Sequence, residues 1–300
     1  MQQITVRVPA STSNLGSGFD CLGVALGIYN TVTIARGASR VHPHPQIASE
    51  AADRFFTQVR RRAFSFSCSI AEQIPRSRGL GSSATIRLGI LLALSRLSGN
   101  SLDRLTIFRL CAELEGHPDN AAPALFGGFS VVQAKASRLA KGRDARFGVQ
   151  HFAVSHRLYF VLFVPDLEVR TSRARDVLPL KISHAAAVEN CANSCAVTAA
   201  FVSQDYERLR GVFGDRLHQP FRAKLIPFLS PTVAAAEKAG ALGAFLSGSG
   251  STIAAVTLHS SKKIAGAMAR AAKTPGRIII THADNFGARL IRNPQSQTRN

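Results

Sequence analysis

The sequence has no tryptophan, and aromatic residues make up only 7% of its 300 residues. It also lacks long apolar runs, because its longest aliphatic stretches, 88–94 and 159–164, fall far short of the roughly 20 residues of a membrane-spanning helix. Its first residues carry no basic segment followed by an apolar run, as a signal peptide would. We therefore expect a cytoplasmic protein with no membrane partner.

Cysteine pairs and acidic residues are scarce as well. None of the five cysteines forms a CxxC pair, which argues against a disulfide framework or a zinc ribbon. Cys191 and Cys195 would share one helical face, where buried free thiols are expected. Asp and Glu total 18 against 37 Lys and Arg, so the formal net charge is +19. Such a charge attracts polyanions, but the basic residues are spread along the chain without a nucleic-acid motif, which predicts no specific nucleic-acid partner.

The remaining composition is that of a folded chain. Hydrophobic residues make up 46% and charged residues 18%, and the length suits one large or two medium domains. Strand-like and helix-like patterns interleave throughout, which predicts an α+β protein. The polar, basic stretch 135–147 suggests a boundary between domains 1–150 and 151–300. We expect a loop over 10–20, a helix capped by Asn100 or Ser101, and one long helix over 183–209.

The clearest chemical signal is a glycine- and serine-rich loop between an alternating strand and an apolar helix. It consists of Pro75, Arg76, Ser77, Arg78, Gly79, Leu80, Gly81, Ser82, Ser83, Ala84 and Thr85. Gly79 and Gly81 allow a ligand to approach the backbone closely. Ser82 and Ser83 fall in the first helical turn, where free N–H groups and the helix dipole favour an anion. A Walker lysine is missing, and the segment taken alone is equally well explained as a glycine turn with a serine cap.

Three blocks together resemble the GHMP small-molecule kinases. Residues 75–84 resemble the phosphate loop of that family, residues 9–23 its N-terminal block as found in the homoserine kinases in particular, and residues 246–252 its C-terminal glycine motif. Their order and spacing match over essentially the whole chain. The resemblance implies a two-domain GHMP kinase fold, with an N-terminal ribosomal-protein-like α/β domain and a C-terminal ferredoxin-like α+β domain. It further implies ATP and Mg²⁺ as cofactors, and a homodimer.

Two glutamates compete for the role of metal ligand. Glu115 follows Cys111 by four residues and Phe108 by seven, which places it on the inward face of a helix. Glu113 points about 200° away and follows Arg109 by four residues, the spacing of a surface ion pair. We therefore expect Glu115 to hold Mg²⁺. The resemblance agrees, and it implies Ser83 as the second ligand.

The resemblance implies ATP-dependent phosphorylation of L-homoserine to O-phospho-L-homoserine, a step toward threonine. Asp20 suits the ammonium of this substrate, and Asn14 can bind nearby. The carboxylate calls for a guanidinium, and the matching positions are Arg175 and Arg222. Thr171 and His117 are further polar candidates. Without the resemblance, Asn14 and Asp20 would be read as turn residues and the arginines as surface charge.

Asn120 stands where several GHMP kinases have an aspartate that can act as a base. An asparagine cannot accept a proton at neutral pH, and the usual lysine near the N-terminal block is replaced by Ser11 and Thr12. We expect catalysis by positioning and charge neutralisation, with Asn120, Glu115 and Ser83 as the catalytic residues. The alternatives are another GHMP kinase acting on a different small alcohol, and a non-catalytic polyanion-binding protein.

Overall fold

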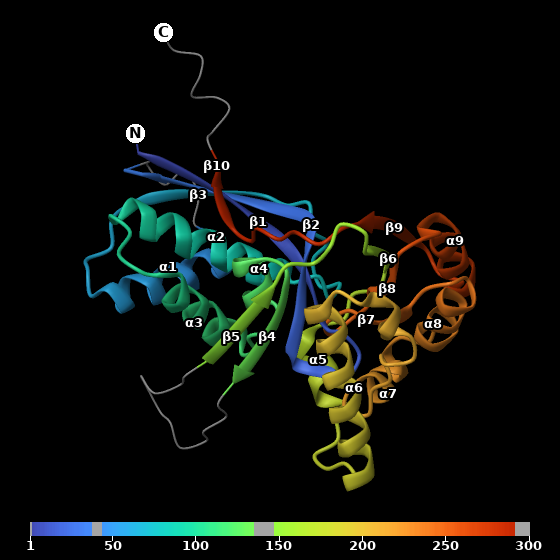
Figure 1. The fold of residues 1–300 in the computed structure, drawn as a ribbon. Coiled ribbons are helices and arrows are strands. Elements are labelled where there is room, and N and C mark those ends of the chain that lie inside the picture. The colour runs from blue at the N-terminus through green and yellow to red at the C-terminus, as the bar shows by residue number, and fades with distance from the viewer. Residues whose placement is uncertain (1, 38–43, 135–146, 292–300) are drawn as a thin grey trace.

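Two antiparallel sheets organise the chain, as Figure 1 shows. The computed structural model describes residues 2–37, 44–134 and 147–291. The first sheet has the order β10-β1-β2-β4-β5, with β3 paired to β2, and the second has the order β7-β8-β6-β9. The strands of the first sheet are β1 (Gln3–Asn14), β2 (Gly18–Arg36), β3 (Phe66–Ala71), β4 (Phe129–Ala134), β5 (Phe147–Phe152) and β10 (Arg289–Ile291). Those of the second are β6 (Tyr159–Pro165), β7 (Gly243–Leu246), β8 (Ile253–Thr257) and β9 (Gly276–Thr281).

The helices divide between the two sheets in the same way. Beside the first sheet lie α1 (Gln46–Val59), α2 (Ser82–Leu97), α3 (Arg104–Glu115) and α4 (Ala121–Phe126). Beside the second lie α5 (Thr171–Asp176), α6 (His184–Ser203), α7 (Gln219–Arg222), α8 (Leu229–Lys238) and α9 (Ser261–Ala272), with 3₁₀ turns at Tyr206–Leu209 and Ala223–Leu225. This confirms the predicted α+β class. No helix in the described ranges is long and apolar enough to cross a membrane.

Three apolar layers hold these elements together. One lies between the first sheet and α1 to α4, one between the second sheet and α8 and α9, and one between the two sheets. Strand β6 shows how the sequence produces this layering. Phe160 and Leu162 face the layer between the sheets, whereas Val161 and Phe163 face α8 and α9. Both faces of β6 are buried, which explains its continuous apolar sequence.

Helix α2 lies at the centre of the first half and brings its N-terminus to the phosphate loop. It packs on β1 and β2 and against α1 and α3, and most of its side chains are buried. A side chain at Gly89 would not fit, because its Cβ would lie 2.5 Å from Cγ2 of Val32 on β2. The apolar run of the helix therefore reflects burial on all sides rather than an amphipathic surface position.

The loop expected over 10–20 is wrong for most of its length. Strand β1 continues to Asn14, β2 begins at Gly18, and only a tight turn separates them. Ser11, Thr12 and Ser13 are fully buried in the strand. Their small side chains therefore reflect close packing against the surrounding segments rather than a turn.

Several local expectations also need correction. The cap of α3 is Asp103, whose Oδ1 accepts a 2.7 Å hydrogen bond from the amide of Thr106, so it is neither Asn100 nor Ser101. Helix α6 ends at Ser203 because Gln204 adopts a left-handed conformation with φ of 56°. The expected boundary stretch, residues 135–146, lies outside the described residues. The domain limit at 150/151 falls within β5 and stays a prediction.

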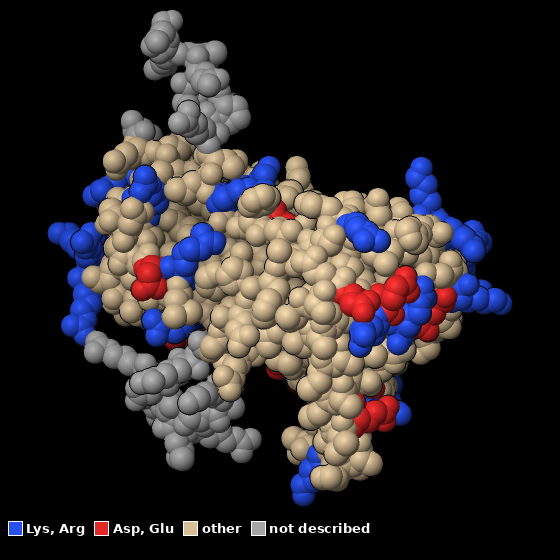
Figure 2. All heavy atoms as spheres, in the orientation of Figure 1, with Lys and Arg blue, Asp and Glu red and all other residues tan. Residues whose placement is uncertain are grey.

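The expectation that Cys191 and Cys195 are buried is wrong. Both thiols are exposed on α6, although they do share one helical face. The spacing gave the relative direction of the two side chains but not which face of the helix packs on the protein. Figure 2 shows Lys and Arg side chains in separate groups over the visible face of the molecule, in keeping with their spread along the sequence.

Candidate active site

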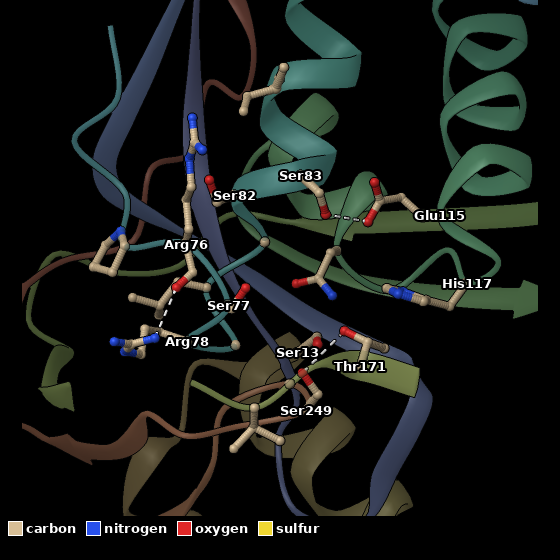
Figure 3. Close-up of a pocket in the computed structure, with 18 of the residues that line it drawn as sticks. Ser13, Arg76, Ser77, Arg78, Ser82, Ser83, Glu115, His117, Thr171 and Ser249 are labelled. Carbon is tan, nitrogen blue, oxygen red and sulfur yellow. Dashed lines mark hydrogen bonds between the residues drawn. The ribbon is translucent and has the colours of Figure 1, made fainter. Parts of the chain in front are cut away.

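A cavity of about 600 Å³ opens where β1, the phosphate loop and the second half of the chain meet. Figure 3 shows side chains from all three converging on it. The predicted site residues that line it are Pro75, Arg76, Ser77, Arg78, Gly79, Leu80, Gly81, Ser82, Ser83, Asn14, Asp20, Glu115, His117, Asn120, Thr171, Arg175 and Arg222. Ala84 and Thr85 do not line it, because their side chains are buried in the first turns of α2. The structure thus brings together residues that are far apart in sequence.

The phosphate loop is built to present backbone amides. Ser77, Gly79 and Gly81 adopt positive φ angles of 52°, 73° and 68°. Gly81 precedes α2 without a side-chain cap, and the first amides of a helix have no partner within the helix, so those of Ser82 and Ser83 can face a ligand. Free amides and the positive end of the helix dipole together attract a phosphate group.

The C-terminal glycine motif supports this loop from the other half of the chain. The Ser247 hydroxyl donates a 2.7 Å hydrogen bond to the carbonyl of Gly79, and the amide of Thr252 donates to the carbonyl of Arg78 at 3.1 Å. A Cβ atom on Gly79 would lie only 2.1 Å from the carbonyl oxygen of Ser247. The motif therefore shapes the phosphate loop through close backbone approach.

Asn30 on β2 is a supporting residue that the sequence analysis missed. Its Nδ2 donates to Thr85 Oγ1 at 2.9 Å, and its Oδ1 accepts from the amides of Gln73 and Ile74 at 2.9 and 3.1 Å. It joins the segment that enters the phosphate loop to the first turn of α2. An asparagine inside a strand gives no sequence signal for such a role, since its partners lie more than 40 residues away.

Ser83 and Glu115 are in contact at the N-terminus of α2. The Ser83 hydroxyl lies 2.7 Å from Oε2 of Glu115, and Figure 3 shows the two side chains facing each other. Arg87, one turn further along α2, forms an ion pair with Glu115 and a second one with Glu50 on α1 at 3.1 Å. Arg87 was not predicted. Its guanidinium places a positive charge beside the Glu115 carboxylate, whose side chain is only 6% exposed.

The Ser83 and Glu115 oxygens fit a magnesium site. Mg²⁺ in kinases is typically held by one or two protein oxygens together with substrate phosphates and waters. One carboxylate and one hydroxyl lie here within 2.7 Å of each other, beside the free amides of the phosphate loop. The described residues contain no cluster of three or more His, Cys, Asp or Glu that could hold a metal without phosphate. Glu113 lies outside the cavity and pairs with Arg54 rather than with Arg109.

Asp20 and Arg175 form a two-pronged ion pair at the opposite end of the cavity. The two terminal nitrogens of Arg175 donate to the two carboxylate oxygens of Asp20 at 3.0 and 2.8 Å. Asn14 holds this arrangement, because its Oδ1 accepts from the amide of Asp20 at 3.0 Å and its Nδ2 donates to the Gly248 carbonyl at 2.9 Å. Nearby, the Thr171 and Ser249 hydroxyls are 3.4 Å apart.

Arg222 lies behind this pair and is only 2% exposed. Its Nε and Nη1 donate to the carbonyls of Ala174 and Gly248 at 3.0 and 2.9 Å. Burial and the neighbouring charge of Arg175 lower the pKa of Arg222 to about 10, so it stays a cation at neutral pH. Its Nη1 also lies 3.2 Å from Nδ1 of His218, whose pKa burial lowers to about 4. A neutral His218 can accept this bond.

His117 and Asp119 form a buried pair in the segment after α3, where both residues line the cavity. Nδ1 of His117 lies 2.7 Å from Oδ1 of Asp119. Burial opposes a charge on either group, yet their mutual attraction raises the pKa of His117 and lowers that of Asp119. Asp119 also accepts from the amide of Asn120 at 3.1 Å, which fixes the backbone that carries this asparagine. Asp119 was not among the predicted site residues.

Another wall of the same cavity is apolar and was also missed by the sequence analysis. Pro45, Ile47, Cys68, Ile70 and Ile86 line it. Burial raises the pKa of the Cys68 thiol to about 11, so this wall carries no charge at neutral pH. Such a wall suits a flat, uncharged ring. No local sequence motif marks these residues, because they come from three separate elements.

Two family models match the chain. The N-terminal domain of the GHMP kinases matches residues 46–128, and the C-terminal domain of the GHMP kinases matches residues 197–274. The protein belongs to the GHMP kinase family, and its mixed α and β architecture has the two-domain form of that family.

Within that family, the chain is similar to homoserine kinases. The homoserine kinase of Caldicellulosiruptor bescii is 38% identical over 267 residues, which cover 84% of this chain and 84% of that protein. That of Desulfitobacterium hafniense is 34% identical and covers 96% of this chain and 100% of its own. The crystal structure of homoserine kinase from Cytophaga hutchinsonii superposes with a TM-score of 0.85 at 25% identity, covering 97% of this chain and 98% of that one.

Proposed function

We propose that the protein transfers the γ-phosphate of ATP to the hydroxyl of L-homoserine, giving O-phospho-L-homoserine and ADP. The observation that carries this proposal is the cavity itself. It joins an amide-lined phosphate loop at one end to a paired carboxylate and guanidinium at the other. The homoserine kinases to which the chain is similar support the same substrate.

The nucleotide end is supported by the phosphate loop and the apolar wall. The amides of Ser82 and Ser83 would bind the phosphates, while Ile47 and Ile70 would pack on the base. Ser83 and Glu115 would hold Mg²⁺, which neutralises charge on the phosphates during transfer. The ion pair with Arg87 would hold the Glu115 carboxylate in place for that role.

The acceptor end is supported by the Asp20 and Arg175 pair. An α-amino acid carries an ammonium and a carboxylate, and it can bind to the same two side chains with matched charges. Arg222 adds a buried positive charge beside the carboxylate position. Mevalonate and shikimate carry a carboxylate but no ammonium, so they would bring no second cation to Asp20 beside Arg175. This favours homoserine over the acceptors of other GHMP kinases.

The chemistry would proceed without a protein base. Asn120 lines the cavity beside the phosphate loop and has no proton-accepting side chain at neutral pH. The acceptor oxygen forms its bond to the γ-phosphorus as the bond to the ADP oxygen breaks, and the hydroxyl proton leaves to phosphate or water. Asn120, the loop amides and Glu115 would act by holding the reactants in line and neutralising charge.

The test is ADP release with L-homoserine, L-serine, mevalonate and shikimate in parallel, at equal Mg²⁺ and ATP. We expect turnover with homoserine well above that with the other three. Turnover only with mevalonate or shikimate would remove the substrate assignment. Turnover with none of them would favour the non-catalytic polyanion-binding protein. We further propose a homodimer acting in the cytoplasm, which size-exclusion chromatography with light scattering and cell fractionation can test.

A further inference from the structure

Ser11 is a buried serine in β1 that contacts both halves of the proposed reaction. Its amide donates a 3.2 Å hydrogen bond to the carbonyl of Leu80 in the phosphate loop. Its hydroxyl donates a 2.9 Å hydrogen bond to Oδ1 of Asn120. The side chain is fully buried and does not line the cavity, so Ser11 touches the catalytic groups from behind.

The bond between Ser11 and Asn120 determines how the amide of Asn120 is turned. A buried hydroxyl proton without an acceptor is unfavourable, and in the described part of the chain Oδ1 of Asn120 is the acceptor that Ser11 uses. Rotating the amide by 180° would remove this acceptor. Oδ1 therefore faces Ser11, and the NH₂ group of Asn120 occupies the other side of the amide, toward the cavity that Asn120 lines.

Gly81 leaves the Ser11 hydroxyl in close contact with this amide. A Cβ atom on Gly81 would lie 2.3 Å from the Ser11 Oγ and 3.0 Å from Oδ1 of Asn120. The phosphate loop thus packs directly on the pair. A shift of the loop would therefore displace the Asn120 side chain, and a shift of Asn120 would displace the loop.

We propose that Ser11 is a positioning residue that fixes Asn120 with its NH₂ group toward the acceptor hydroxyl. In that orientation Asn120 donates a hydrogen bond to the attacking oxygen and leaves a second lone pair of that oxygen free to attack phosphorus. The inference rests on the proposed function and adds a specific role for Ser11 within it. It also explains how a serine in this part of β1 contributes to catalysis without carrying a charge.

The test compares Ser11→Ala with Asn120→Ala and with the double variant. Ser11→Ala keeps the backbone bond to Leu80 and removes only the bond to Asn120. We expect kcat/KM for homoserine to fall about tenfold, the effect of losing one hydrogen bond, while the KM for ATP stays within about twofold. In the Asn120→Ala background, Ser11→Ala should change kcat/KM by less than about twofold, because Ser11 acts through Asn120.

Ser130→Ala is the matched control, since Ser130 is equally buried in β4 and its hydroxyl has no hydrogen-bond partner among the described residues. Both serine variants should show similar melting temperatures, and only Ser11→Ala should lose activity. An unchanged kcat/KM in Ser11→Ala, or an equal loss with and without Asn120, overturns the role of Ser11 alone. A wild-type chain that turns over no acceptor would instead remove the proposed function, and this inference with it.

Discussion

At the scale of single residues, Glu113 and Glu115 show how helix α3 separates a surface charge from a site charge. Glu115 meets Ser83 inside the cavity, whereas Glu113 pairs with Arg54 on the surface. We expect Glu115→Gln to lower Mg²⁺-dependent turnover at least about 100-fold, because a neutral amide is a much weaker ligand for Mg²⁺. The measurement is ADP release as a function of Mg²⁺ concentration.

Glu113→Gln is the control for this change, since it makes the same substitution two positions away on the same helix. Its loss is confined to an exposed ion pair, whose contribution to stability is at most about 1 kcal/mol. Turnover should therefore stay within about twofold of wild type. Equal losses in the two variants would show that Glu115 does not hold the metal.

Arg175 supports a second prediction at this scale. Its two terminal nitrogens bind both oxygens of Asp20, and a lysine cannot reproduce that two-pronged geometry. We expect Arg175→Lys to raise the KM for homoserine about tenfold or more and to leave the KM for ATP unchanged. Initial rates with each substrate varied in turn measure this.

Arg173→Lys provides the comparison, because Arg173 is exposed on the same helix, α5, and does not line the cavity. Its kinetics should match those of wild type. A rise in the KM for ATP in Arg175→Lys, with that for homoserine unaffected, would contradict the assignment of this arginine to the acceptor end.

Sequence reasoning identified the cavity residues better than it identified their partners. Helical spacing was enough to direct Glu115 inward and Glu113 outward. The ion pair of Arg87 with Glu115 could not be predicted, because it depends on how α2 packs on α3. The same holds for Asp20, which was expected to bind substrate but whose pairing with Arg175 joins segments 155 residues apart.

At the scale of elements, periodic patterns predicted the longer helices, but they missed the short helix α4, which lies in a segment rich in turn-forming residues. The strand before the phosphate loop and helix α2 follow their sequence patterns closely. The end of β1 does not, because its serines and threonine resemble a loop. Their side chains are small because the phosphate loop and the C-terminal glycine motif pack closely on this strand. The backbones of Leu80 and Gly248 form hydrogen bonds with it. Only the tertiary structure reveals that contact.

The close approach of these two loops gives a third prediction. Gly79→Ala would place a Cβ atom 2.1 Å from the carbonyl oxygen of Ser247 and would also be strained by the φ of 73°. We expect the phosphate loop to move and the affinity for ATP to fall more than about tenfold. Isothermal titration with a non-hydrolysable ATP analogue measures this affinity.

Gly99→Ala isolates the effect of the clash from that of the backbone conformation. Gly99 has a φ of 79°, but a Cβ atom there would meet nothing within 4 Å. It should cost about 1 kcal/mol of stability and leave ATP affinity unchanged. Equal ATP affinities in the two variants would mean that contact with Ser247 does not shape the phosphate loop.

At the scale of the whole molecule, the two halves are joined by a shared apolar layer and by the return of the chain to the first sheet. After β9 the chain passes Asp284 and adds β10 beside β1. Asp284 is buried and accepts hydrogen bonds from Tyr29 on β2, from the amides of Phe286 and Gly287, and from Arg289. It therefore ties the last segment of the chain to the first sheet.

This tie predicts a dependence of stability on pH. Burial alone would raise the pKa of Asp284, but the bonds from Tyr29 and Arg289 hold it below its usual value of 3.8. A carboxylate with a lowered pKa stabilises the fold above its unfolded pKa and loses that effect as the pH falls through the folded value. Asp284→Asn should cost about 1–3 kcal/mol at pH 7, the range for a lost bond to a charged group.

The difference in unfolding free energy between wild type and Asp284→Asn should be constant from pH 5 to 7 and should shrink as the pH falls below the ordinary value of 3.8. Urea unfolding at a series of pH values measures it. Asp205→Asn is the matched control, because Asp205 pairs with Arg208 on the surface and should change stability by less than about 0.5 kcal/mol at any pH. A difference for Asp284→Asn that persists unchanged at pH 2 would mean that the charge of Asp284 contributes nothing. Asp284 would then hold the last strand to the first sheet through its shape and neutral hydrogen bonds alone.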